Sequence, residues 1–92
     1  DWDQPGQSIF NLVRGLSPYP TARTQLDGKL LKVYRCTFVP ENHSRYPGTY
    51  TTNHDDYLGF YCADGVVQLN EVQLEGKKRM DVASFLRGIN LG

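Results

Sequence analysis

The run from Gly76 to Met80, GKKRM, carries the strongest polar signal in the sequence. Three consecutive cations after a glycine attract the phosphate groups of a nucleic acid independently of its base sequence. Contact with a polyanion is therefore the chemistry that this run favours. A solvated, charged turn is the ordinary alternative for an isolated Lys-Lys-Arg run. The sequence therefore predicts either a phosphate-contacting segment or an exposed turn here, and neither is a catalytic step.

The other candidates for chemistry are weaker. The triplet His54-Asp55-Asp56 offers metal-binding side chains, and His43 lies in a second polar segment, but no third ligand follows at a recognisable spacing. The sequence has no GxSxG motif, no glycine-rich phosphate loop and no Cys/His pair with an orienting carboxylate. We expect no metal site and no catalytic residue in this chain.

Two cysteines, Cys36 and Cys62, stand in strand-like runs without a CxxC or Cys/His spacing. Reduced, packed thiols are the expected state, with a disulfide as the alternative. Reduced thiols are typical of the cytoplasm, where we expect the protein to reside. No apolar run approaches the roughly 20 residues of a membrane span, so no membrane contact is expected. The first residue is Asp1, not Met, and we expect the chain to be a piece of a longer protein.

The formal net charge is zero, but the charges are segregated along the chain. Residues 28–46 hold four cations and one anion, and residues 77–92 again hold four cations and one anion. Residues 47–76 hold five carboxylates and no Lys or Arg. Such segregation permits one basic face and one acidic face on a small domain.

An amphipathic helix is expected to open the chain. Five apolar residues lie on one helical face, namely Ile9, Phe10, Leu12, Val13 and Leu16. Asp3 is the predicted N-cap and Pro5 fits the first turn, where a backbone N–H has no partner within the helix. The helix is predicted to end near residues 17–20, because the residue before each proline is excluded from the α region.

After this helix the apolar period changes to two. The predicted strands are 21–26, 29–39, 48–52, 58–63 and 66–74, and residues 40–47 and 52–57 are predicted loops. Asp27-Gly28 predicts a type I′ hairpin turn, and Asp64-Gly65 is expected to join the last two strands. A short helix at the C-terminus is expected to begin at Asp81, to end at Gly88 in the left-handed conformation, and to be anchored by Met80, Phe85 and Leu86.

The apolar parity switches inside two of the strands. Leu31 and Val33 share one face whereas Tyr34, Cys36 and Phe38 share the other, and the same switch occurs between Leu69 and Val72. A β-bulge produces this pattern where a sheet coils. We therefore expect a single domain over residues 1–92, mainly β with two helices, whose five or six strands form a small closed or nearly closed barrel.

Six collinear segments make the chain similar to the C-terminal domain of methionyl-tRNA formyltransferases. They are WDQP (2–5), RGLSPYP (14–20), LDGKLLKV (26–33), PGT (47–49), ADG (63–65) and VQLEGKKRMDVASFLRG (72–88). The resemblance implies a barrel of OB-like topology that follows a Rossmann-like N-terminal catalytic domain. That domain, with its Asn, His and Asp catalytic residues and its folate motif, is absent from this sequence.

The family's enzyme transfers a formyl group from 10-formyltetrahydrofolate to the methionine of initiator tRNA in translation initiation. The resemblance therefore implies no cofactor and no catalytic residue in this domain, 10-formyltetrahydrofolate for the parent enzyme, and initiator tRNA and the catalytic domain as partners. Because the family's barrel offers tRNA a positive surface, the implied RNA-binding residues are Lys77, Lys78 and Arg79, followed by Lys32, Arg35, Arg45 and Arg87. For Arg14, a local capping or pairing role stands beside RNA contact.

A different class of function stays open. Related barrels follow formyltransferase domains that act on folate or on nucleotide-sugars, where no tRNA is bound, and a neutral chain suits a structural role. On that reading the barrel packs against its catalytic domain through an exposed apolar patch. If the domain does bind tRNA, a few phosphate contacts predict weak affinity, with a Kd of about 10⁻⁴–10⁻⁶ M at physiological salt.

Overall fold

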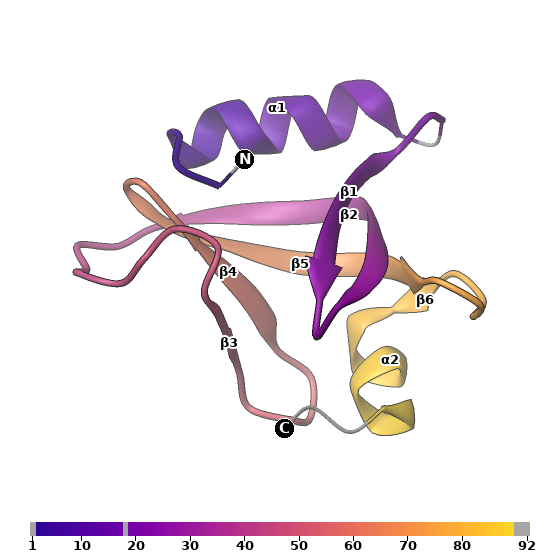
Figure 1. Ribbon diagram of the computed structural model, residues 1–92. Helices are drawn as coiled ribbons and strands as arrows, with labels where there is room; N and C mark the ends of the chain where they lie inside the picture. The colour runs from indigo at the N-terminus through magenta and orange to yellow at the C-terminus, as the bar shows by residue number, and fades with distance from the viewer. Residues whose placement is uncertain (1, 18, 90–92) are drawn as a thin grey trace.

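The computed structural model describes residues 2–17 and 19–89. The helix α1 (Gly6–Leu16) is followed by the strands β1 (Ala22–Leu26), β2 (Lys29–Pro40), β3 (Tyr50–Thr52), β4 (Leu58–Cys62), β5 (Gly65–Leu74) and β6 (Met80–Asp81), and then by the helix α2 (Val82–Gly88). Each of the five predicted strands is present, and β6 is a short addition. Figure 1 shows α1 over one side of the β2–β5 pair and α2 on the other side.

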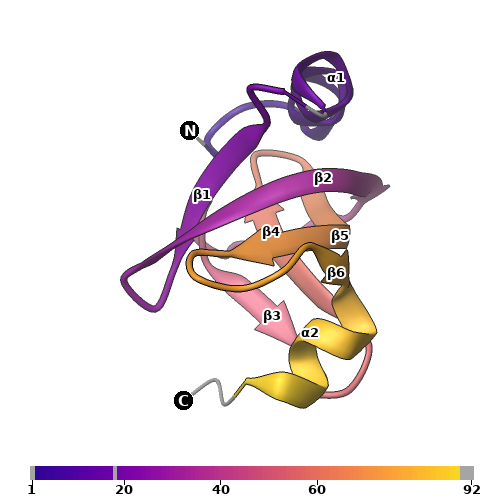
Figure 2. The same ribbon diagram turned by 90° about the vertical axis from the view of Figure 1, so that its right-hand side faces the viewer.

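The strands form one antiparallel sheet in the order β1-β2-β5-β4-β3, with β6 paired to β5. The sheet curls into a half-barrel whose edge strands, β1 and β3, do not pair with each other (Figure 2). Closure into a full barrel, which the sequence left possible, is therefore not seen in the described strands. Trp2 spans the open side instead: its ring stacks on Phe60 with centroids 4.7 Å apart, and its Nε1 donates to Thr24 Oγ1 at 3.0 Å.

The predicted bulges are confirmed in the longest strand pair. Val33 pairs with Val72, Arg35 with Glu71 and Cys36 with Leu69, so Tyr34 and Asn70 are skipped in the register. The shift lets apolar residues on both sides of it reach the core, and Leu31, Val33, Leu69 and Val72 are all buried. It also leaves Tyr34 and Asn70 without a paired residue on the opposite strand, which a regular ladder would have provided.

The N-terminus of α1 corrects one prediction. The cap position is Pro5, and the acceptor for the first helical N–H comes from the β4–β5 turn, because Gly6 N–H donates to Asp64 Oδ1 at 2.8 Å. Asp3 is therefore not the N-cap. Sequence reasoning missed this because the acceptor lies far along the chain from the helix that it caps. Ile9 and Val13 are buried as predicted, whereas Leu12 is 49% exposed.

Asp64→Ala is expected to lower the free energy of unfolding by about 1 kcal/mol, because the start of α1 loses its side-chain acceptor. Asp64→Asn keeps a carbonyl acceptor at the same place and should retain most of that stability. Urea denaturation followed by circular dichroism measures both changes. Equal destabilisation by the two variants would contradict a capping role for this side chain.

Of the two turns predicted at Asp-Gly pairs, the structure confirms the first and shifts the second by one residue. Asp27 and Gly28 both have positive φ, at 51° and 81°, which confirms the predicted hairpin. At the second site the turn residues are Ala63 and Asp64, and Gly65 instead begins β5, where it pairs with Cys62 and with Pro40. A Cβ on Gly65 would lie 2.3 Å from the carbonyl oxygen of Val39, so close packing between strands requires glycine there.

The C-terminal helix begins as predicted. Ser84 N–H and the Ser84 hydroxyl both donate to the Asp81 carboxylate, at 3.4 and 2.7 Å. Phe85 and Leu86 are buried and Met80 packs against the core. The prediction that Gly88 ends this helix in the left-handed conformation is wrong. Gly88 is the last helical residue, and the backbone of the next residue, Ile89, is extended.

Cys36 and Cys62 are free, buried thiols. Burial raises the pKa of Cys36 to about 11, so this thiol stays protonated at neutral pH. Within residues 2–17 and 19–89, no helix has the length and apolar character needed to cross a membrane.

Candidate nucleic-acid interface

A basic surface forms where β2, β5 and the β5–β6 turn meet. We define it by five residues that these elements carry: Lys32, Arg35, Lys77, Lys78 and Arg79. In the strand pair, Lys32 lies opposite Gln73 and Arg35 lies opposite Glu71. The turn then brings Arg79 back to the same strands, where it contacts Glu71 of β5 and Tyr34 of β2. Five of the seven predicted RNA-binding residues therefore belong to β2 and to the β5–β6 turn.

Glu71 organises two of these cations. Arg79 binds its carboxylate through two contacts, Nε to Oε2 at 2.9 Å and an Nη to Oε1 at 3.0 Å, and Arg35 Nε reaches Oε1 at 3.1 Å. Paired guanidinium–carboxylate bonds of this kind hold an arginine in a fixed orientation. Because two guanidinium groups share one carboxylate, the cluster keeps a net positive charge.

Tyr34, the bulged residue of β2, supports the same cluster. The Arg79 guanidinium lies 3.9 Å from the centroid of the Tyr34 ring, a cation–π distance. The Tyr34 hydroxyl donates to Gln73 Oε1 at 2.8 Å, and Gln73 Nε2 donates to the Lys77 carbonyl at 2.9 Å. The bulge therefore ties the sheet surface to the turn that carries the lysines.

The charges of the cluster are mutually stabilising. Hydrogen bonds from Arg79, and then from Arg35, hold the pKa of Glu71 below its usual value, although desolvation opposes them. The hydrogen bond with Glu71 likewise raises the pKa of Arg79. Both residues are therefore charged throughout the physiological range.

This coupling predicts how stability depends on pH. A carboxylate whose pKa is lower in the folded state than in the unfolded state stabilises the folded state at pH values above its unfolded-state pKa. This contribution disappears as the pH falls through the folded-state pKa. Wild type should therefore be more stable than Glu71→Gln at neutral pH, and the difference should shrink progressively below about pH 4.5, the ordinary value for this group. Urea midpoints measured from pH 7 to pH 2 check this.

Glu41→Gln is the matched control for Glu71→Gln, because the described residues show no ion pair between Glu41 and an arginine. The control difference should be smaller at pH 7. A Glu71→Gln difference that stays constant down to pH 2 would contradict the charge coupling.

Lys77 and Lys78, like Lys32, are cations of the basic surface that form no ion pair among the described residues. Gly76 adopts a positive φ of 79°, and Lys77 N–H donates to the Leu74 carbonyl at 2.9 Å, which fixes the turn. Both lysines are exposed, and among the described residues neither forms an ion pair. These side chains are free to meet a phosphate without first leaving a carboxylate.

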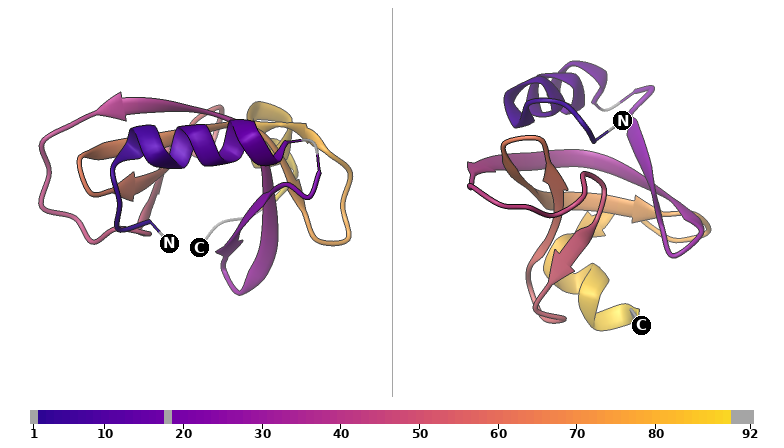
Figure 3. Two further views of the ribbon diagram at one scale, coloured as in Figure 1. Left: turned by 90° about the horizontal axis from the view of Figure 1, so that it is seen from above. Right: turned by 60° about the vertical axis from the view of Figure 1, so that its left-hand side comes forward.

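Arg45 and Arg87 lie apart from this surface. Arg45 belongs to the β2–β3 connection, where its guanidinium is 5.8 Å from the Tyr61 ring centroid. Figure 1 and the left view of Figure 3 show this connection at the opposite end of the molecule from the β5–β6 turn. Arg87 belongs to α2, and its Nε lies 3.9 Å from Asp55 Oδ1. The structure thus brings together Arg35 and Arg79, places Lys32, Lys77 and Lys78 on the same strands and turn, and leaves these two arginines elsewhere.

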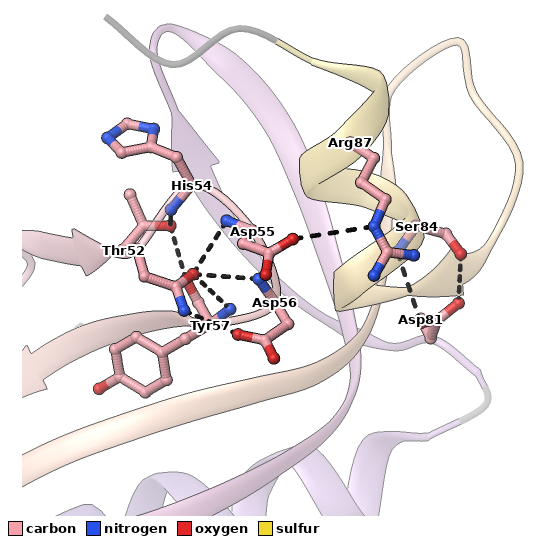
Figure 4. A network of polar contacts seen from close by, with 9 residues as sticks. Thr52, His54, Asp55, Asp56, Tyr57, Asp81, Ser84 and Arg87 are labelled. Atoms are coloured by element: carbon pink, nitrogen blue, oxygen red, sulfur yellow. Dashed lines mark hydrogen bonds and ion pairs between the residues drawn. The ribbon is translucent and has the colours of Figure 1, made fainter.

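The acidic loop that faces Arg87 is organised by its own side chains. Asn53 Oδ1 accepts the backbone N–H groups of Asp55, Asp56 and Tyr57, and Thr52 Oγ1 accepts that of His54 (Figure 4). Within the described ranges, no three His, Cys, Asp or Glu side chains gather as metal ligands would. The His43 ring has a structural role: its Nε2 forms a hydrogen bond with the Cys62 carbonyl, and its Nδ1 accepts the backbone N–H of Arg45.

A second basic feature adjoins the basic surface. A groove of about 280 Å³ runs between α1 and β2. One wall consists of Phe10, Val13 and Arg14, and the other consists of Tyr34, Arg35, Cys36, Thr37 and Asn70. We call this the α1–β2 groove. Sequence reasoning did not place Arg14 and Arg35 in one groove, because this arrangement depends on how α1 packs against β2.

Sequence comparisons with known proteins identify the family. Residues 1–90 match the model of the family described as formyl transferase, C-terminal domain. The chain belongs to this family. It is 44% identical to a methionyl-tRNA formyltransferase of Parabacteroides distasonis over 93 residues, which covers 96% of this chain and 29% of the relative.

Other relatives give the same match. A methionyl-tRNA formyltransferase of Geobacter metallireducens is 42% identical over 99% of this chain and 29% of its own length. One of Clostridium novyi is 35% identical over 96% of this chain and 28% of its own length. The chain thus spans less than a third of the curated relatives that it matches.

Proposed function

We propose that this chain is the tRNA-contacting C-terminal domain of a methionyl-tRNA formyltransferase. The parent enzyme formylates the methionine of initiator tRNA in the cytoplasm, at the start of translation, with 10-formyltetrahydrofolate as formyl donor. The observation that carries the proposal is the basic surface, in which Glu71 orients two arginines beside two lysines that have no carboxylate partner among the described residues. The names of the relatives supply the substrate.

In this proposal the domain positions tRNA and performs no bond chemistry. Lys77 and Lys78 attract phosphates as mobile point charges, while Arg35 and Arg79 present oriented guanidinium groups. Lys32 extends the same surface along β2. The catalytic residues and the folate site belong to an N-terminal domain that precedes residues 1–92 in the parent enzyme.

Arg45 and Arg87 have a secondary place in this proposal. Arg87 faces Asp55, and Arg45 lies over Tyr61 at the other end of the sheet. We infer that these two contact tRNA only at the periphery. Their removal should weaken binding less than the removal of two lysines from the β5–β6 turn.

The test is a titration of the ¹⁵N-labelled chain with initiator tRNA at low salt. Backbone amide signals of Gly76 to Arg79 and of Lys32 to Arg35 should shift or broaden first. Signals from the acidic loop, Asn53 to Tyr57, should change least, because like charges repel. Changes confined to that loop would contradict the proposal.

A second candidate function rests on a different face. Leu12 is 49% exposed. It lies beside a hollow of about 390 Å³ that is lined by residues of α1 and β1 and by Trp2, the first described residue. The exposed Leu12 beside this hollow suits a barrel whose role is to pack against its own catalytic domain. The same titration separates the two functions, because a purely domain-packing barrel gives no signal changes with tRNA even at low salt.

A further inference from the structure

We propose that the α1–β2 groove holds one unpaired nucleotide of the bound RNA, with its phosphate between Arg14 and Arg35. This inference rests on the proposed function and adds a specific subsite to it. The groove is distinct from the β5–β6 turn, but Tyr34 and Arg35 of its wall adjoin that turn, because Tyr34 contacts Arg79 and Arg35 shares Glu71 with it.

The charge of the groove favours an anion. Two of its lining residues are arginines, and none of the lining residues from the described part of the chain is Asp or Glu. Arg14 makes no ion pair within residues 2–17 and 19–89, and Arg35 shares its carboxylate with Arg79. A phosphate between Arg14 and Arg35 would therefore meet one guanidinium group without an ion pair and one that Glu71 also holds, with no Asp or Glu among the described lining residues.

The size and chemistry of the groove favour a nucleotide over a bare anion. Its volume of about 280 Å³ is close to the roughly 300 Å³ at which small-molecule sites begin. The buried Val13 and Cys36, together with the rings of Phe10 and Tyr34, give it an apolar half. Unpaired bases are the part of RNA that proteins hold against aromatic and apolar side chains.

Asn70 provides a polar group that can contact a base edge. Its Oδ1 accepts from the Thr37 hydroxyl at 3.0 Å, which directs the amide of a residue that the bulge leaves out of the β2–β5 register. An amide so held offers its N–H₂ donors to a ligand in the groove. Base edges are accessible to such groups only where the base is unpaired, because the deep, narrow major groove of A-form RNA hides them.

The position of the groove gives RNA a continuous path. Arg35 belongs both to the basic surface and to the groove wall, and Tyr34 contacts Arg79 and also lines the groove. The left view of Figure 3 shows α1 lying along the β2–β5 pair. An RNA strand that meets Lys77 and Lys78 can therefore continue past Arg35 to Arg14.

The first arm of the test compares Arg14→Glu with Arg23→Glu in the chain, by fluorescence anisotropy with labelled initiator tRNA. Both arginines are exposed and both substitutions change the net charge equally, but Arg23 lies on β1 outside the groove. Arg14→Glu should weaken binding about fivefold or more, the loss of at least one phosphate contact, and Arg23→Glu less than twofold. Equal effects of the two variants on a chain that binds tRNA would overturn the groove and leave the proposed function standing.

The second arm uses hexaadenylate RNA and inorganic phosphate as probes of the ¹⁵N-labelled chain at matched ionic strength. Hexaadenylate should shift the Asn70 side-chain amide signal, and the shift should be absent in Arg14→Glu. Equal shifts with inorganic phosphate would overturn the nucleotide assignment, since the groove would then be an anion site alone. Failure of wild type to bind tRNA at any salt concentration would instead refute the proposed function.

Discussion

Phe60→Ala is expected to lower the free energy of unfolding by about 3–5 kcal/mol. Phe60 is 1% exposed, and its β4 position places it between Tyr50 and Val67 of the neighbouring strands. The Trp2 ring stacks on the Phe60 ring with an interplanar angle of 4°. The substitution leaves a cavity and removes the support for the side chain that spans the open side of the half-barrel.

A loss of this size matters because small domains are stable by only about 5–15 kcal/mol. Urea denaturation followed by circular dichroism gives the change directly. Tyr46→Ala is the matched control, since this aromatic residue is 83% exposed and its removal should cost less than about 0.5 kcal/mol. A Phe60→Ala loss as small as that of the control would show that the core is not packed around this ring.

The double variant Lys77→Glu/Lys78→Glu is expected to weaken binding to initiator tRNA about tenfold or more near 0.15 M salt, because two phosphate contacts are lost and replaced by repulsion. Both lysines are exposed on a turn that Gly76 and the Gln73–Lys77 hydrogen bond hold in place, so the fold should survive. Fluorescence anisotropy with labelled tRNA measures the change. Circular dichroism confirms that the variant is folded.

Arg45→Glu/Arg87→Glu is the matched control for the lysine variant. It changes the net charge by the same amount, but at residues that lie away from the basic surface. It should weaken binding by a smaller factor than the lysine variant. Equal losses would mean that tRNA responds to the total charge of the domain and does not recognise a particular face.

Local patterns were sufficient to predict most of the fold. The period-two runs located the five main strands, Asp27-Gly28 located the first hairpin turn, and the parity switch at Val33 and Tyr34 located the bulge. Each of these signals lies within one element or its turn. The same is true of Asp81, which caps the short C-terminal helix from an adjacent position.

Features that depend on distant residues were not predictable in this way. The cap of α1 comes from Asp64, not Asp3, and Gly65 is required by the approach of Val39 in a neighbouring strand. The convergence of Arg35 and Arg79 on Glu71 depends on strand register, which no local pattern specifies. The basic residues were therefore found by type, whereas their division into one surface and two outlying arginines needed the tertiary structure.

The most direct test of tRNA docking through the basic surface is the salt dependence of the affinity. The logarithm of the association constant for initiator tRNA should fall linearly with the logarithm of the salt concentration, and Lys77→Glu/Lys78→Glu should make that slope shallower by about two. Such a change assigns two phosphate contacts to the β5–β6 turn. Identical slopes for wild type and variant would contradict docking through this surface.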